Sequence, residues 1–143
     1  MKKRALTILS IDDDEGYQKL CARFFNIAAG HTVEAAFNGK DGLEMAARLR
    51  PDFILLDMVM PGLSGDLVLE ALYENAATRD IPVCIVSGGD LSSYKRILYA
   101  NKNLRGIENK PLRFGPLLEK IEAWCGQVPG EKSLSGIFYL ATG

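Results

Sequence analysis

The sequence has few cysteine and histidine residues, which zinc-binding and disulfide-linked proteins require. Among its 143 residues there are three cysteines and one histidine, His31. Because Cys21, Cys84 and Cys125 form no CxxC pair and no cluster with the histidine, a zinc site built from them is not expected. Their odd number and wide spacing favour buried or half-buried free thiols in a reducing cytosol.

Long hydrophobic runs and an excess of one charge are also absent. No apolar run approaches the length of a transmembrane helix. The basic start at residues 1–4 is followed by an apolar run that is too short for an export signal and ends at Asp12. The chain has 17 basic and 18 acidic residues, a formal net charge of -1, without the basic excess of a general nucleic-acid binder. We therefore expect a cytoplasmic protein with no membrane insertion and no direct nucleic-acid contact.

Short apolar segments alternate with amphipathic ones along most of the chain. The expected strands are residues 5–11, 32–37, 53–56, 81–86 and 104–108. The expected helices are residues 15–28, 39–49, 65–76 and 112–124, with a further helix that begins at Asp90 or Ser92 and ends at about residue 100. Such alternation predicts an α/β protein with a doubly wound parallel sheet. The continuous apolar run at residues 53–56 favours a strand whose two faces are both covered by helices.

The length suits one domain, which we place at residues 1–125. Residues 126–143 are rich in glycine, proline and serine and are expected to be a C-terminal tail or linker. They include a short apolar stretch, Ile137 to Leu140, whose role the sequence leaves open.

Polar side chains are expected at the carboxyl ends of four strands, where parallel sheets place their working sites. Asp12 and Asp13 follow the first strand, Asp57 the third, Ser87 the fourth and Lys110 the fifth. Three carboxylates that meet at one edge repel one another unless a cation lies between them, and Mg²⁺ prefers such oxygen ligands. An aspartate can form an acyl phosphate, with a lysine and a hydroxyl near the phosphoryl oxygens.

Each member of this set also has a simpler interpretation. Acidic runs at strand ends are often solvated loops, and Asp14 is expected to cap the next helix and not to bind metal. Asp57 alone fits a turn, Ser87 fits a glycine loop, and Lys110 with Pro111 is a common surface pair. The combination, in this order at successive strand ends, is far more specific than any member.

With these residues identified, the sequence resembles the receiver domains of bacterial two-component response regulators, including the chemotaxis regulators. The resemblance covers about residues 4–125 and rests on four segments: Ile8 to Asp14, Pro51 to Gly65, Ile81 to Gly88, and Lys110 to Leu112. It implies a flavodoxin-like five-stranded parallel sheet of strand order 2-1-3-4-5 with helices on both faces.

The resemblance implies a phosphorelay role for the acidic residues. Asp57 would accept a phosphoryl group from a phosphohistidine of a partner histidine kinase or histidine phosphotransfer protein. Asp12, Asp13 and the backbone carbonyl of Val59 would hold Mg²⁺ together with Asp57. The protein would then be a signalling switch that assists its own phosphorylation and dephosphorylation, and not an enzyme with a separate substrate.

The resemblance also implies how the signal leaves the site. Lys110 would contact the phosphoryl group, and Ser87 would move towards it and change the contacts with a downstream protein target. The family usually has an aromatic residue three positions before the lysine, where this sequence has Ile107. Because isoleucine is stiff at its first torsion and has no ring, the usual aromatic readout is not expected. Homodimer formation is left open.

Two other functions remain open at this level. A phosphohydrolase of the haloacid dehalogenase type also uses an aspartyl nucleophile, but it commonly has an acid two residues later, where this chain has Val59. A receiver-like interaction module that is no longer phosphorylated would be consistent with Ile107. The sequence also leaves open whether the chain acts alone or is part of a larger protein.

Overall fold

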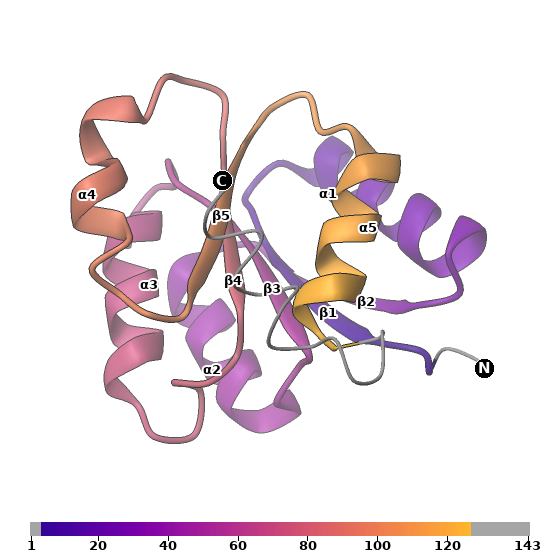
Figure 1. Ribbon diagram of the computed structural model, residues 1–143, viewed down its shortest axis with the longest axis horizontal. Coiled ribbons are helices and arrows are strands. Elements are labelled where there is room, and N and C mark those ends of the chain that lie inside the picture. The colour runs from indigo at the N-terminus through magenta and orange to yellow at the C-terminus, as the bar shows by residue number, and fades with distance from the viewer. Residues whose placement is uncertain (1–3, 127–143) are drawn as a thin grey trace.

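The computed structural model of the protein describes residues 4–126, which form a parallel β-sheet with helices on both faces (Figure 1). The strands are β1 (Thr7–Ile11), β2 (Thr32–Ala36), β3 (Phe53–Asp57), β4 (Val83–Ser87) and β5 (Leu104–Asn109). They are ordered β2-β1-β3-β4-β5, and every neighbouring pair is parallel. The predicted α/β fold and strand order are therefore confirmed.

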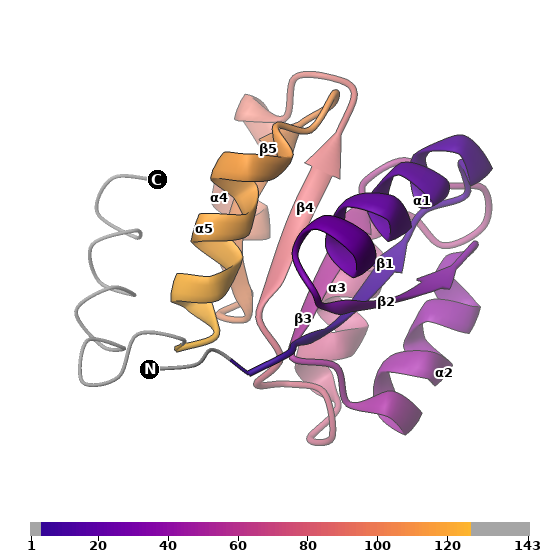
Figure 2. The ribbon, with the colours of Figure 1, turned by 90° about the vertical axis from the view of Figure 1, so that its right-hand side faces the viewer.

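The helices are divided between the two faces of the sheet. Their bounds are α1 (Glu15–Ala22), η1 (Arg23–Ala28), α2 (Gly39–Leu49), α3 (Gly65–Glu74), η2 (Ser92–Tyr94), α4 (Lys95–Leu98) and α5 (Phe114–Trp124). Figure 2 shows α1 and α5 on one side of the sheet and α2, α3 and α4 on the other. Two hydrophobic clusters, one on each face, fill the space between helices and sheet.

Two predicted helices differ from the observed ones. The segment predicted as one helix over residues 15–28 is α-helical only to Ala22 and continues as the π-helix η1. The helix predicted from Asp90 or Ser92 to about residue 100 begins at Ser92 as the 3₁₀ turn η2 and has only four α-helical residues, in α4. There the Asp90 carboxylate accepts a hydrogen bond from the backbone N–H of Ser92 at 2.9 Å. Short polar side chains that bind nearby backbone groups compete with helix formation. The other predicted boundaries are within two residues of the observed ones.

The central strand β3 fixes the position of the residue that follows its apolar run. Every residue of β3 is buried, as its continuous apolar sequence predicts. Ile54 and Leu56 pack in the cluster beneath α2, α3 and α4, whereas Phe53 and Leu55 pack beneath α1 and α5. Asp57 therefore emerges between two packed layers at the carboxyl edge of the sheet.

The described part of the chain ends two residues after α5. Gly126 has a positive φ of 69° and its N–H donates to the carbonyl of Ala123, an arrangement typical of a helix stop. Residues 127–143 of the predicted tail lie outside the described residues, so the boundary at residue 125 stays a prediction. Cys21 and Cys84 are buried free thiols, as expected. Within residues 4–126, no helix is long and apolar enough to cross a membrane.

Candidate functional site

Three carboxylates converge at the carboxyl edge of the sheet. Asp12 and Asp13 follow β1, Asp57 ends β3, and one carboxylate oxygen from each lies within 4.8 Å of the others. Asp12 and Asp57 are buried, with 1% and 7% of their surface exposed, whereas Asp13 is exposed. The convergence expected from the strand ends is therefore present. Oxygen ligands at this spacing fit a hard divalent cation such as Mg²⁺.

The third acid of the run has the structural role expected for it. The Asp14 carboxylate accepts a hydrogen bond from the backbone N–H of Tyr17 at 3.1 Å, which caps the start of α1. The backbone N–H of Asp14 in turn donates to Asp12 Oδ1 at 2.9 Å. The turn between β1 and α1 therefore holds the Asp12 carboxylate in place.

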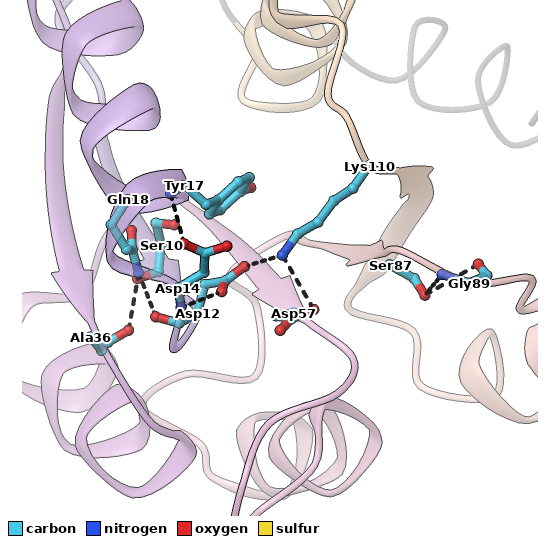
Figure 3. A network of polar contacts seen from close by, with 10 residues as sticks. All are labelled: Ser10, Asp12, Asp14, Tyr17, Gln18, Ala36, Asp57, Ser87, Gly89 and Lys110. Atoms are coloured by element: carbon cyan, nitrogen blue, oxygen red, sulfur yellow. Dashed lines mark hydrogen bonds and ion pairs between the residues drawn. The ribbon is translucent and has the colours of Figure 1, made fainter.

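Gln18, which the sequence analysis did not single out, also holds this turn. Its side-chain Nε2 lies 2.9 Å from the carbonyl of Ser10, 3.0 Å from that of Asp12 and 3.1 Å from that of Ala36 (Figure 3). The buried amide thereby joins the ends of β1 and β2. A polar residue in an amphipathic helix carries no local signal for such contacts, so the sequence pattern had no means of indicating them.

Lys110, which follows the edge strand β5, also contacts the acidic cluster. Its ammonium donates to Asp12 Oδ2 at 2.7 Å and lies 3.8 Å from Asp57 Oδ1 (Figure 3). Burial disfavours the charged form, but the hydrogen bond to Asp12 and the charges of Asp12 and Asp57 outweigh this effect and raise the lysine pKa. The amine is therefore a fixed positive charge at neutral pH.

The Asp57 carboxyl is a weaker acid than an ordinary aspartate. Burial, and next the nearby charge of Asp12, raise its pKa to about 6. Lys110 and the backbone N–H of Val59 act in the opposite direction without cancelling the rise. The residue Val59 itself is 76% exposed. The contact between Val59 and Asp57 is made by the backbone N–H. The expected role of the Val59 carbonyl as a metal ligand therefore stays a prediction.

Ser87 ends β4, and its hydroxyl bonds to its own loop. The hydroxyl accepts a hydrogen bond from the N–H of Gly89 at 3.0 Å and lies 3.2 Å from the Gly89 carbonyl. Figure 3 shows this pair apart from the cluster of Asp12, Asp57 and Lys110. In this conformation the serine is at the expected strand end but its hydroxyl is engaged by the loop, so its expected contact with a phosphoryl group stays a prediction.

Ile107 lies on β5 opposite Ile85 of β4. It is partly buried and packs against the hydrophobic cluster beneath α2, α3 and α4. At the position where the family usually has an aromatic residue, this aliphatic side chain therefore contributes to the hydrophobic core.

Comparison with known proteins identifies the family. Residues 8–122 match the model of the response regulator receiver domain. The chain belongs to this family. It is therefore a receiver domain of the two-component signalling type, and receiver domains are signalling switches.

Curated relatives match different shares of their own length. Protein PilH of Pseudomonas aeruginosa is 38% identical over 94 residues, which are 66% of this chain and 77% of PilH. Response regulator PleD of Caulobacter vibrioides is 40% identical over 83 residues, which are 58% of this chain but 18% of PleD. The chain also spans 43% of the probable C4-dicarboxylate response regulator DctR of Priestia megaterium, at 30% identity over 68% of this chain. Outside PilH, the match thus covers only part of these larger regulators.

Solved structures share the same fold. The N-terminal domain of a response regulator receiver protein from Methanoculleus marisnigri superimposes with a TM-score of 0.69 at 29% identity, over 83% of this chain and 95% of that one. Chemotaxis protein CheY4 of Vibrio cholerae gives a TM-score of 0.76 at 23% identity, over 83% of this chain and 98% of that one. The second likeness concerns the fold alone.

Proposed function

We propose that this receiver domain is a phosphoacceptor whose Asp57 takes a phosphoryl group from a phosphohistidine of a partner histidine kinase or histidine phosphotransfer protein. The observation that carries the proposal is the placement of the Asp57 carboxylate beside two further acids and within 3.8 Å of the Lys110 ammonium. A carboxylate nucleophile, acidic ligands for a cation and a fixed positive charge are what phosphoryl transfer needs.

The transfer exchanges the bond between phosphorus and the donor nitrogen for a bond between phosphorus and a carboxylate oxygen. A carboxylate oxygen of Asp57 attacks phosphorus, a P–O bond forms, and the P–N bond to the donor imidazole breaks. The imidazole takes up a proton from water and leaves as the neutral side chain. Dephosphorylation reverses the state of the switch when water attacks phosphorus and the Asp57 carboxylate leaves. The domain thereby assists both reactions of its own side chain.

Asp12, Asp13, Asp57 and the backbone carbonyl of Val59 would hold Mg²⁺ in this proposal. The fit is supported by the carboxylate oxygens that lie within 4.8 Å of one another on Asp12, Asp13 and Asp57. When bound, Mg²⁺ neutralises the negative charge on the phosphoryl oxygens. Lys110 would contact the same oxygens from the side of β5, because its charged form is favoured by the acids around it.

Ser87 is the residue through which we expect the signal to leave the site. Its hydroxyl would exchange Gly89 for a phosphoryl oxygen, and the loop after β4 would follow. This movement would alter contacts with a downstream protein target in the cytoplasm, with or without a homodimer. The aliphatic Ile107 has no ring to turn inward, so we place the conformational change in the loop after Ser87.

The experiment is phosphorylation of the purified chain with acetyl phosphate and Mg²⁺, read by intact mass and located by peptide mapping. We expect one phosphoryl group on Asp57, and none in Asp57→Asn. Asp52→Asn is the matched control, because Asp52 precedes the same strand at its opposite end and contacts Arg4 and Thr7. A well-folded chain that binds Mg²⁺ but takes no phosphoryl group would instead be a receiver-like interaction module.

A further inference from the structure

The side chain of Lys110 has a second neighbour besides the acids. The centre of the Tyr17 ring lies 4.4 Å from Lys110 Nζ, and Figure 3 shows both side chains next to the acidic cluster. This separation is within the range of about 6 Å over which a ring face attracts a cation. The same nitrogen is 2.7 Å from Asp12 Oδ2, so the ammonium is in contact with both the ring and a carboxylate.

The ring is held in this place by its own surroundings. Tyr17 lies in the first turn of α1, where its backbone N–H is bonded to the capping Asp14. Its side chain packs against the hydrophobic cluster beneath α1 and α5. Burial raises the pKa of the Tyr17 hydroxyl far above its usual range, so the phenol is uncharged. The lysine, with 24% of its side chain exposed, therefore meets a fixed neutral ring.

We propose that Tyr17 is a positioning residue that holds the Lys110 ammonium over the acidic cluster for phosphoryl transfer. This inference rests on the proposed function, because it concerns how Lys110 is presented to the phosphoryl group. A ring face attracts the cation without neutralising it, whereas a carboxylate partner reduces the charge available to phosphoryl oxygens. Asp12 is proposed to bind Mg²⁺ as well as Lys110, whereas the Tyr17 ring would hold the lysine without binding the metal.

Positioning matters here because lysine is long and has several rotatable bonds. Phosphoryl transfer depends almost entirely on positioning and on electrostatic stabilisation. Without the ring, the ammonium has more freedom to turn towards solvent through its exposed side. The cost is expected in the rate of Asp57 phosphorylation, while the acidic ligands remain in place.

The test compares Tyr17→Leu, which removes the ring face, with Tyr17→Phe, which keeps it. Tyr73→Leu is the matched control, because Tyr73 is another half-buried tyrosine with a cation, Arg79, 5.9 Å from its ring centre. The initial rate with acetyl phosphate at saturating Mg²⁺ is measured per folded molecule. We expect Tyr17→Leu to be about three- to tenfold slower, and Tyr17→Phe and Tyr73→Leu to stay within about twofold of wild type.

A second readout reports the contact itself. In the wild type, NMR resonances of the Lys110 ε-methylene group should be displaced by the ring current of Tyr17 relative to those of Lys120. The displacement should persist in Tyr17→Phe and vanish in Tyr17→Leu. If Tyr17→Leu does not fold, the wild-type and Tyr17→Phe spectra decide, and unshifted Lys110 resonances overturn the inference.

The outcomes separate the inference from the function on which it rests. A wild type that takes no phosphoryl group refutes the proposed function, and the positioning role is then refuted with it. A wild type that is phosphorylated at Asp57 while Tyr17→Leu reacts equally fast refutes the positioning role alone. Slow Tyr17→Leu with normal Tyr17→Phe supports both.

Discussion

The Lys110 ammonium is closer to Asp12 than to Asp57, at 2.7 Å from one carboxylate and 3.8 Å from the other. Lys110, which follows β5, is thus hydrogen-bonded to the residue that follows β1, although β3 and β4 lie between these two strands in the sheet. Asp12 is almost fully buried, so this contact is screened little by water. Asp57, the proposed phosphoacceptor, therefore has a positive charge close by that is hydrogen-bonded to Asp12 and not to Asp57 itself.

Removing the lysine charge is expected to slow phosphorylation. In Lys110→Met the apolar stem remains but no cation faces the phosphoryl oxygens, and loss of one such electrostatic contact costs on the order of a hundredfold in rate. The rate with acetyl phosphate and Mg²⁺ measures this. Lys120→Met is the control, because Lys120 pairs with Glu108 at 3.5 Å, away from the acidic cluster. Equal rates in Lys110→Met and wild type would contradict the role given to the lysine.

The raised pKa of Asp57 predicts how stability depends on pH when no divalent cation is present. The native state keeps its proton to about pH 6, whereas the unfolded chain loses it near 3.8. Ionisation of Asp57 therefore lowers the free energy of unfolding as the pH rises between these values, by about 1–2 kcal/mol after allowance for solvent screening. Asp57→Asn should be more stable than wild type at pH 7 and should lose this advantage below pH 4. Urea unfolding with EDTA at several pH values measures the difference.

The opposite sign is expected at the other end of the same strand. Burial disfavours the charged form of Asp52, but the hydrogen bonds from Arg4 and from the N–H of Thr7 outweigh it and lower its pKa. Its contribution is present at neutral pH and is lost as the pH falls through the lowered value. Asp52→Asn should therefore destabilise the protein at pH 7. If Asp52→Asn and Asp57→Asn changed the free energy of unfolding at pH 7 in the same direction, the opposite pKa shifts of the two aspartates would be contradicted.

A methyl group at Gly65 should disrupt the loop that follows Asp57. A Cβ at Gly65 would lie 2.7 Å from the backbone Cα of Met58, and the Gly65 N–H donates to the Met58 carbonyl at 2.8 Å. We expect Gly65→Ala to lower the free energy of unfolding by about 2–3 kcal/mol, since backbone atoms must move. Gly115→Ala is the control, because a Cβ there would have no atom within 4 Å apart from those of its chain neighbours and its own helix backbone. Thermal unfolding of both variants measures the contrast.

His31 is expected to stabilise the fold without affecting the chemistry. Its Nδ1 accepts a hydrogen bond from the Leu6 N–H at 3.0 Å, so the ring proton lies on Nε2, 3.1 Å from a Glu122 oxygen. His31→Ala leaves a buried backbone N–H without its acceptor and should cost about 2–4 kcal/mol. Urea unfolding measures the loss, and the phosphorylation rate per folded molecule should not change. A slower rate in the folded variant would contradict this separation.

The edge of the sheet that holds the acidic cluster was predictable from the sequence because it depends on topology. Parallel strands end at one edge of the sheet, so the alternation of strands and helices places Asp12, Asp57 and Lys110 at the same edge. The cap at Asp14 is equally local, since it depends on residues three positions apart. The helix that ends at about residue 100 was predicted too long. The Asp90 side chain binds the backbone N–H of Ser92 and competes with helix formation, and the pattern of apolar residues does not indicate this contact.

The sequence by itself determined the apolar strands and the charged residues that follow them. These features depend on short-range patterns and on the geometry of a parallel sheet. Only the tertiary structure decided which side chains meet across helices. It places Tyr17 on Lys110, Gln18 against three backbone carbonyls and the Ser87 hydroxyl on Gly89. Such contacts depend on how α1 and the loops pack, and no periodicity along the chain encodes that packing.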